Sequence, residues 1–484
     1  MRSTAVPVFI AVVGGMLACS EPFADRATST PHLQSITQSG TCPAHATKVV
    51  ASEGDLMAAL EGASPGDTIA IRGTIALDQP EFDVVTSNVT VTCATPGSGV
   101  VVATGNTPSW LFVVWAPGVT IEHLALDARG AAGGSYLAIF DGVGGFASDE
   151  RFTHNQITCG PMSDSCVFFA LEGSHGATAT DNAIITAGTG LGLHLEGVVG
   201  GSIARNSVVA TDSGSRGILV DAGSGVDVAD DSVRGPWNVA VLVKDAADSI
   251  TVERGNFSGG SFATIRLVDL THFRFLGNTV TCSAICFEMF GSPGAHVTGN
   301  RVVATGAITG IDVEPHNELV TDGATVDGNV IQALSPSGIA GEGGIHVSTG
   351  TGLTVTNNTV TGPWVNSMAL TFLAGSRIQG NTLVGSAGAG IAFTTDTATQ
   401  PITFTGDTVQ SNVVTAWSTT GVSIQAACRN LLAGNVVEGK GTVDLLLAPT
   451  TGANRVVAGA RGIVNQGAQD CDGDGIVDPN VIGR

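Results

Sequence analysis

The sequence predicts an all-β protein, namely one single-stranded right-handed parallel β-helix solenoid of about 13–15 coils with a short N-terminal capping helix. The first indication of this fold is the composition, because glycine accounts for 66 of 484 residues and charged residues for only 13%. Such glycine-rich, β-branched chains suit short strands separated by tight turns. Second, an Asn or Asp recurs before short apolar runs, in eleven intervals that span 280 residues, or about 25 residues each. Third, each period holds three short alternating runs without a helical period, which excludes helical repeats.

The recurring polar residues are expected to be structural, because Asn tolerates the left-handed backbone of a bend and stacked Asn side chains can bond along the axis. They are Asn155, Asn182, Asn206, Asp231, Asn256, Asn278, Asn300, Asn329, Asn358, Asn381, Asn412 and Asn435. The unit is clearest between residues 310 and 360, where it starts at Gly310 and again at Gly344.

Bulk properties exclude two classes of protein. The formal net charge of -22 argues against a nucleic-acid partner, which needs a basic footprint. The apolar fraction of 43% is ample for a core and argues against disorder.

The first 19 residues predict export. Arg2 precedes a short apolar run at residues 6–13, which is too short to span a bilayer, and Cys19 follows Ala18. This pattern resembles a bacterial lipoprotein signal, which implies that Cys19 is lipidated and holds the protein at the outer membrane or cell surface. An ordinary secretory signal is the alternative. Residues 20–41, rich in Ser, Thr and Gln, predict a flexible tether.

The folded body is expected at residues 42–468. Leu56, Met57 and Leu60 have helical spacing within residues 53–61, and a Pro-Gly-Asp-Thr-Ile segment follows from Pro65. This combination resembles the N-terminal cap of right-handed parallel β-helix proteins, and the body resembles the pectate lyase-like β-helix repeat superfamily. The resemblance implies a fold and leaves the activity open.

Eight cysteines besides Cys19 indicate an oxidising compartment. Proximity in the sequence and the need to pin both ends predict four disulfides: Cys42–Cys93, Cys159–Cys166, Cys282–Cys286 and Cys428–Cys471.

The tail, residues 469–484, has the spacing of a calcium loop. Asp470, Asp472, Asp474 and Asp478 take positions 1, 3, 5 and 9, and Ile476 offers a main-chain carbonyl at position 7. The pattern resembles an EF-hand or thrombospondin type 3 loop and predicts a bound Ca²⁺, although position 12 lacks the usual Glu.

Aligning the strands that follow the Gly-Ile-x-Val pattern predicts one outward face that carries a charged ladder. The candidate substrate-binding residues on it are His194, Glu196, Asp221, Glu288 and His346. Polysaccharides commonly lie on such a polar stripe in these folds. The alternative is a solvated face whose charges neutralise one another.

Two resemblances on this face suggest chemistry. Lys244 and Arg266, one coil apart, are similar to the Lys base and Arg acid of chondroitinase B and alginate lyases. For Lys244 to act as such a base, its pKa would have to be lowered. Asp312, Glu314 and His316, around Pro315, resemble the Asp-Pro-His motif of mannuronan C5-epimerases and are also a candidate cation site.

Two hypotheses of function follow. In the first, the protein is an exported, membrane-anchored β-helix repeat protein that binds or processes polysaccharide at the cell surface. If it is an enzyme, a lyase-like activity is favoured over an epimerase. In the second, it is a non-catalytic structural or adhesive surface lipoprotein.

Overall fold

The computed structural model describes residues 41–483 except 79–81, 103–109, 131–134, 142–147, 161–162, 171–174, 189, 246, 317–319, 339–342, 395–403, 458–461, 468 and 473. The signal, the tether and Cys19 therefore lie outside the described residues. The described chain forms a parallel β-solenoid of about 16 turns, as predicted in kind and slightly longer than the predicted 13–15. The difference arises because the Asn signature marks only the middle coils and misses coils at both ends.

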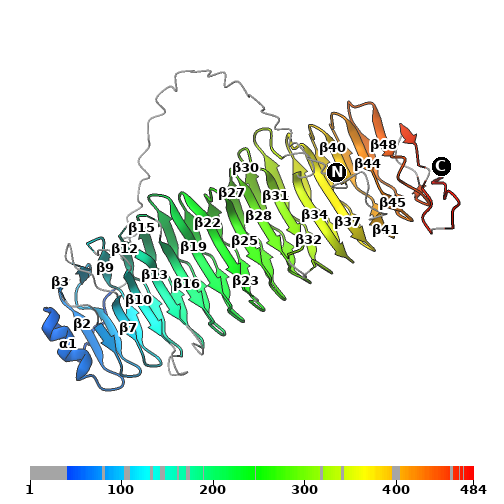
Figure 1. The fold of residues 1–484 in the computed structure, drawn as a ribbon. Coiled ribbons are helices and arrows are strands. Elements are labelled where there is room, and N and C mark those ends of the chain that lie inside the picture. The colour runs from blue at the N-terminus through cyan, green and yellow to red at the C-terminus, as the bar shows by residue number, and fades with distance from the viewer. Residues whose placement is uncertain are drawn as a thin grey trace, which may run out of the picture. The chain divides into compact units, whose positions relative to one another are not determined.

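Three sheets run along the solenoid from the blue end to the red end of Figure 1, and most coils add one strand to each sheet. We call them sheets A, B and C. Sheet A comprises β1 (Lys48–Val50), β2 (Thr68–Ile71), β5 (Thr90–Cys93), β8 (Thr120–Glu122), β11 (Arg151–Thr153), β14 (Thr178–Thr180), β17 (Ser202–Ala204), β20 (Asp227–Ala229), β23 (Thr251–Glu253), β26 (Arg274–Leu276), β29 (His296–Thr298), β32 (Thr325–Asp327), β35 (Thr354–Thr356), β38 (Arg377–Gln379), β42 (Thr408–Gln410), β46 (Leu431–Ala433), β49 (Arg455–Val457) and β51 (Val481–Gly483).

Sheet B comprises β3 (Thr74–Leu77), β6 (Gly99–Val102), β9 (Ala125–Ala128), β12 (Gln156–Cys159), β15 (Ala183–Thr186), β18 (Ser207–Ala210), β21 (Ser232–Arg234), β24 (Asn256–Ser258), β27 (Thr279–Cys282), β30 (Arg301–Ala304), β33 (Val330–Ala333), β36 (Thr359–Thr361), β39 (Thr382–Val384), β43 (Val413–Thr415) and β47 (Val436–Glu438).

Sheet C comprises β4 (Phe82–Val84), β7 (Trp110–Val114), β10 (Ser135–Asp141), β13 (Ser163–Ala170), β16 (Leu191–Glu196), β19 (Gly214–Asp221), β22 (Trp237–Lys244), β25 (Ala263–Val268), β28 (Ile285–Phe290), β31 (Thr309–Glu314), β34 (Gly343–Thr351), β37 (Asn366–Ala374), β40 (Ala389–Thr394), β41 (Phe404–Thr405), β44 (Thr420–Ile424), β45 (Ala427–Cys428), β48 (Val443–Leu447) and β50 (Ile463–Asn465).

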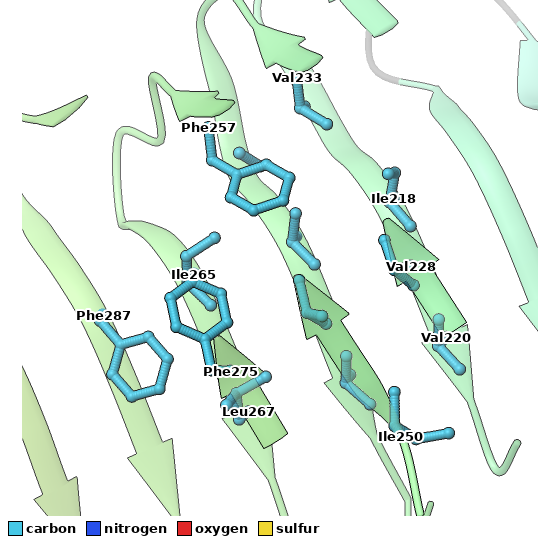
Figure 2. Packing of buried hydrophobic residues seen from close by; sticks show 14 of the residues in the cluster. Ile218, Val220, Val228, Val233, Ile250, Phe257, Ile265, Leu267, Phe275 and Phe287 are labelled. Carbon is cyan, nitrogen blue, oxygen red and sulfur yellow. The ribbon is translucent and has the colours of Figure 1, made fainter. Parts of the chain in front are cut away.

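The core fills the space enclosed by the three sheets. Alternate side chains of each strand point inward, so that residues such as Ile218, Val228 and Val233 from one coil stack on those of the next (Figure 2). These side chains are fully buried, and stacked burial of this kind is the main stabilising term of a solenoid.

The helix α1 (Glu53–Glu61) caps the N-terminal end, with the bounds that the sequence predicts. The Ser52 side chain accepts a hydrogen bond from the main-chain N–H of Asp55 at 3.2 Å, which satisfies one free donor of the first turn. Leu56, Ala59 and Leu60 are buried.

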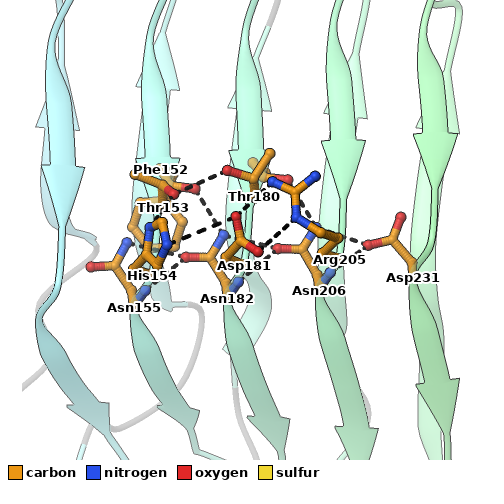
Figure 3. A network of polar contacts seen from close by, with 11 residues as sticks. Phe152, Thr153, His154, Asn155, Thr180, Asp181, Asn182, Arg205, Asn206 and Asp231 are labelled. Carbon is orange, nitrogen blue, oxygen red and sulfur yellow. Dashed lines mark hydrogen bonds and ion pairs between the residues drawn. The ribbon is translucent and has the colours of Figure 1, made fainter. Parts of the chain in front are cut away.

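An Asn ladder occupies the bend between sheets A and B. The Asn182 amide nitrogen donates to Asn206 Oδ1 at 2.9 Å and to the carbonyl of Phe152 at 2.8 Å, and Asn155 and Asn206 repeat this arrangement (Figure 3). A second run of the same contacts extends from Asn278 to Asn435. The predicted stacking of these side chains along the axis agrees with these bonds. The left-handed backbone predicted for the Asn residues is wrong, because the positive φ falls on the residue before each ladder position, as at Asp181 and Gly299.

Between the two runs, the prediction for Asn256 is wrong by one residue. The ladder position belongs to Gly255, whose N–H donates to Asn278 Oδ1 at 2.8 Å, whereas Asn256 is an exposed residue of β24. A Cβ at Gly255 would lie 2.1 Å from the Phe257 ring, so that ring fills the space of the missing amide.

The residues just before the ladder form a second column, which we call the charged bend. His154, Asp181, Arg205, Asp230 and Arg254 all have positive φ. The Arg205 guanidinium donates two hydrogen bonds, of 2.8 and 2.7 Å, to the Asp181 carboxylate (Figure 3). The Arg254 guanidinium donates two to the Asp230 carboxylate, of 2.9 and 3.0 Å.

The four predicted disulfides are all present, two of them joining a cap or tail to a coil. Cys428–Cys471 ties the tail to β45. The tail is more than an appendage, because β51 pairs in parallel with β49 and adds a strand to sheet A.

Candidate functional site

The predicted polar face is the outward side of sheet C, where two columns of side chains run from coil to coil. Column one, ordered by strand register, is Phe168, His194, Leu219, Leu242, Arg266, Glu288, Asp312 and His346. Column two contains Glu196, Asp221 and Lys244, followed further along by Phe290 and Glu314. The predicted substrate-binding residues therefore all lie on one face of one sheet.

The last three side chains of column one are nearly closed to solvent, although they point away from the core. Glu288, Asp312 and His346 are only 4%, 5% and 7% exposed. Charged groups are seldom this buried unless they are paired.

Arg266 sits between two aromatic rings. Its guanidinium carbon lies 4.8 Å from the centre of the Phe262 ring and 5.4 Å from that of Phe290, and its Nε lies 3.3 Å from Glu288 Oε2. The ring of Phe262 remains 42% exposed. A fixed cation beside an exposed ring can bind a ligand that has both an apolar face and hydrogen-bond acceptors.

Lys244 is held by carboxylates. Its Nζ lies 2.6 Å from Asp221 Oδ2 and also contacts Asp245. Burial disfavours the charged amine, but the hydrogen bonds to Asp221 and Asp245 outweigh it and raise the pKa of Lys244 above its ordinary value. The lowered lysine pKa that a lyase base requires is therefore absent from this structure.

His194 follows Phe168 in column one and has apolar neighbours. Its ring stacks on Phe168 at 4.5 Å between centroids, and Leu219 and Leu242 follow it in register. Burial, followed by the nearby charges of Lys244 and Arg216, lowers the pKa of His194 to about 4, so the imidazole is neutral near pH 7. Its Nε2 is buried without a hydrogen-bond partner among the described residues.

Asp312, Glu314 and His346 form a compact cluster at the other end, which we call the carboxylate–histidine cluster. His346 Nδ1 lies 2.8 Å from Asp312 Oδ1 and 3.4 Å from Glu314 Oε1. Burial would lower the pKa of His346, but hydrogen bonds to Asp312 and Glu314 outweigh it and raise the pKa to about 10. The cluster therefore holds an imidazolium between two carboxylates.

Of the predicted cation set, Asp312 and Glu314 lie together with His346, whereas His316 contacts Asp269. β31 ends at Glu314 and Pro315 follows, so His316 lies beyond the strand, where its Nδ1 is 2.8 Å from Asp269 Oδ1. His346 takes the third place because it lies opposite Asp312 in the register of β31 and β34. The signal that could have found it is the Gly-Ile-x-Val alignment, which puts Asp312 and His346 at the same position.

The tail brings together three of its predicted calcium ligands. Ligand oxygens of Asp470, Asp472 and Asp478 all lie within 4.8 Å of one another. Asp474 Oδ1 instead accepts a hydrogen bond from the main-chain N–H of Ile476 at 2.7 Å. Gly475 has a positive φ of 84°, as position 6 of such a loop requires.

The fold defines the class of protein: the chain is a right-handed parallel β-helix repeat protein. Residues 165–331 match the family model described as "Right handed beta helix region", and residues 303–458 match the model described as "Periplasmic copper-binding protein (NosD)". No curated protein matches the chain. No helix among the described residues is both long and apolar enough to cross a bilayer.

Similar solved structures include several that act on polysaccharides. The A-module of the mannuronan C-5 epimerase AlgE6 of Azotobacter vinelandii is 13% identical, with a TM-score of 0.38 over 86% of this chain and 95% of that chain. The catalytic unit of a GH87 alpha-1,3-glucanase of Streptomyces thermodiastaticus is 14% identical, with a TM-score of 0.37 over 89% and 71%. A PL6 family polysaccharide lyase of Pseudopedobacter saltans is 11% identical, with a TM-score of 0.28 over 90% and 91%. At these values neither an activity nor a residue role is transferred to this chain.

Proposed function

We propose that the protein is an exported glycan-binding protein that holds a polysaccharide on the outward face of sheet C without cleaving it. One observation carries the proposal: the Arg266 guanidinium contacts the rings of both Phe262 and Phe290, and Phe262 is 42% exposed. Sugars offer an apolar C–H face that stacks on such a ring and hydroxyls that accept from such a guanidinium.

Binding is favoured over cleavage by the state of Lys244. A lysine that Asp221 and Asp245 hold protonated can donate hydrogen bonds to a sugar but cannot remove a proton from it. The face therefore has donors and a stacking surface, and lacks the base that a lyase would need at this position.

The charge balance favours a neutral glycan. Arg266 is matched by Glu288, and Lys244 is matched by two carboxylates, within a chain of net charge -22. An anionic polymer would be repelled unless a divalent cation bridged it to the face.

Three observations support export. The four disulfides require an oxidising compartment, the first 19 residues resemble a lipoprotein signal, and residues 303–458 match a family described as periplasmic. Lipidation of Cys19, and with it attachment to the outer membrane or cell surface, is part of the proposal. Mass spectrometry of the mature N-terminus tests it.

Affinity electrophoresis through gels that contain neutral or acidic polysaccharides tests the glycan proposal. We expect retardation by at least one neutral polysaccharide, and a loss of retardation of about tenfold or more in Phe262→Ala and in Arg266→Ala. Val330→Ala, an exposed apolar residue of sheet B, is the matched control and should behave as the wild type.

Two outcomes would overturn the proposal. Absence of retardation across the panel would favour the structural or adhesive alternative. Unsaturated uronate absorbance with an acidic polysaccharide, lost in Lys244→Ala, would show lyase chemistry and make the protein an enzyme.

A further inference from the structure

We propose that the carboxylate–histidine cluster of Asp312, Glu314 and His346 is a binding site for a borderline divalent transition-metal ion of the Zn²⁺ class. The site lies on the same outward face of sheet C as the proposed glycan-binding residues, but its test does not depend on the glycan-binding proposal, because Phe262 and Arg266 supply none of its ligands.

The donor set fits such an ion. Two carboxylate oxygens and one imidazole nitrogen are ligands that Zn²⁺ accepts, whereas Ca²⁺ takes oxygen ligands. The three ligand atoms already lie within 4.8 Å of one another. Zinc bonds of about 2.0–2.2 Å would bring them to roughly 3.5 Å apart, which needs only small side-chain movements.

The positions are rigid and correctly directed. Asp312 and His346 lie opposite each other on the hydrogen-bonded strands β31 and β34, and Glu314 follows two residues after Asp312, hence on the same face. Sites on strands hold ligand geometry better than sites on loops. His346 and Asp312 are more than nine-tenths buried, while Glu314 is half-buried and gives access from solvent.

The electrostatics favour a dication. Two carboxylates face a single imidazole, and the neighbouring Glu288 already faces Arg266. Zinc binding releases the proton of the His346 imidazolium to solvent. Two carboxylates and the resulting neutral imidazole around a dication form a group with no net charge, which is the arrangement that burial penalises least.

Isothermal titration calorimetry with ZnCl₂ tests the site, using the purified chain with Asp472→Ala as the background so that the tail loop does not contribute. We expect one Zn²⁺ per chain, and a zinc affinity at least tenfold weaker in Glu314→Gln and in His346→Gln. Glu196→Gln, a carboxylate of the same column as Glu314 but several coils away, should bind zinc as the background protein does.

The melting temperature without metal shows whether each variant folds. Glu314→Gln is the decisive variant because its side chain is half-buried and the amide has the same shape. The proposal is overturned if zinc gives no binding, if Glu314→Gln binds zinc as tightly as the background protein, or if equimolar Ca²⁺ competes equally with zinc.

Discussion

Asp231 is the one acid in the first run of the Asn ladder. Its Oδ1 accepts hydrogen bonds from the main-chain N–H and amide of Asn206 at 2.7 and 3.0 Å, as an Asn oxygen does in other rungs. Its Oδ2 has no hydrogen-bond partner among the described residues. Where the other rungs have an amide that donates to a main-chain carbonyl, a carboxyl can donate only when it carries a proton.

The pKa of Asp231 reflects this placement. Burial raises it to about 7, against the lowering effect of the hydrogen bonds from Asn206, and the neighbours Asp230 and Arg205 have smaller opposing effects. The folded chain therefore binds this proton more tightly than the unfolded chain, whose Asp has a pKa of about 3.9. The contribution of Asp231 to stability is complete below about pH 4 and is lost as the pH rises through about 7.

We predict that Asp231→Asn stabilises the protein at pH 8, by about 1–3 kcal/mol, because the amide completes the ladder without a proton. The same variant should flatten the fall in stability between pH 5 and pH 8. Chemical denaturation at both pH values measures the effect.

Asp227→Asn, an exposed change on the neighbouring strand β20, is the control and should change stability by less than about 0.5 kcal/mol. A wild-type pH dependence that persists in Asp231→Asn would contradict the prediction.

At the scale of elements, hydrogen bonds of Asp478 connect the tail loop to the segment that leads into the last strand. Asp478 Oδ2 accepts from the Cys471 N–H at 2.9 Å, and its carbonyl accepts from the Ala453 N–H at 3.0 Å. A cation held by Asp470, Asp472 and Asp478 would therefore fix the segment that leads into β51.

We predict that Ca²⁺ binds this loop and slows amide exchange in β51, and that Asp472→Ala removes both effects. Calorimetry and hydrogen exchange, each with and without Ca²⁺, provide the measurements. Glu438→Ala, an exposed carboxylate at the end of β47, should leave both unchanged. Equal heats of Ca²⁺ binding in the wild type and Asp472→Ala would refute the assignment.

The periodic elements could be predicted from the sequence, whereas the elements that depend on long-range strand register could not. Three alternating runs per period and helical spacing at Leu56 and Leu60 were sufficient for the solenoid and for the bounds of α1. A second ladder through Asp407, Asn430, Asn454 and Asn480, between sheets C and A, was missed because it covers only the last coils.

The site could be predicted only in part for a related reason. The outward face follows from alternation along each strand, which sequence shows. The position at which a strand ends, as β31 does at Glu314, decides which side chains meet across coils, and the sequence does not show it. The charge state of Lys244 depends on contacts with Asp221 and Asp245 that residue spacing does not reveal.

At the scale of the whole described solenoid, each coil is stabilised by its two neighbours, so the first coil depends on its cap. Leu56 is fully buried in α1 and faces the first strands, whereas Ala58 of the same helix is exposed. Without the cap, the open strand edges of the first coil could pair with another molecule.

We predict that Leu56→Asp makes the protein self-associate in a concentration-dependent manner and lowers its stability by several kcal/mol. Light scattering after size exclusion and thermal unfolding measure the two effects. Ala58→Asp places the same charge on the outside of the helix and should remain as the wild type. A monomeric Leu56→Asp would show that the first coil does not need this contact.

The charged bend has a consequence for how such a chain can lengthen during evolution. Asp181, Arg205, Asp230 and Arg254 alternate in sign from one coil to the next, so each charge has opposite neighbours within the run. Duplication of a single coil here would place two like charges side by side, whereas duplication of two coils would preserve the alternation. Only an even number of added coils therefore preserves the alternation of charge in this stretch, so growth by pairs of coils leaves every bend residue with its counterion.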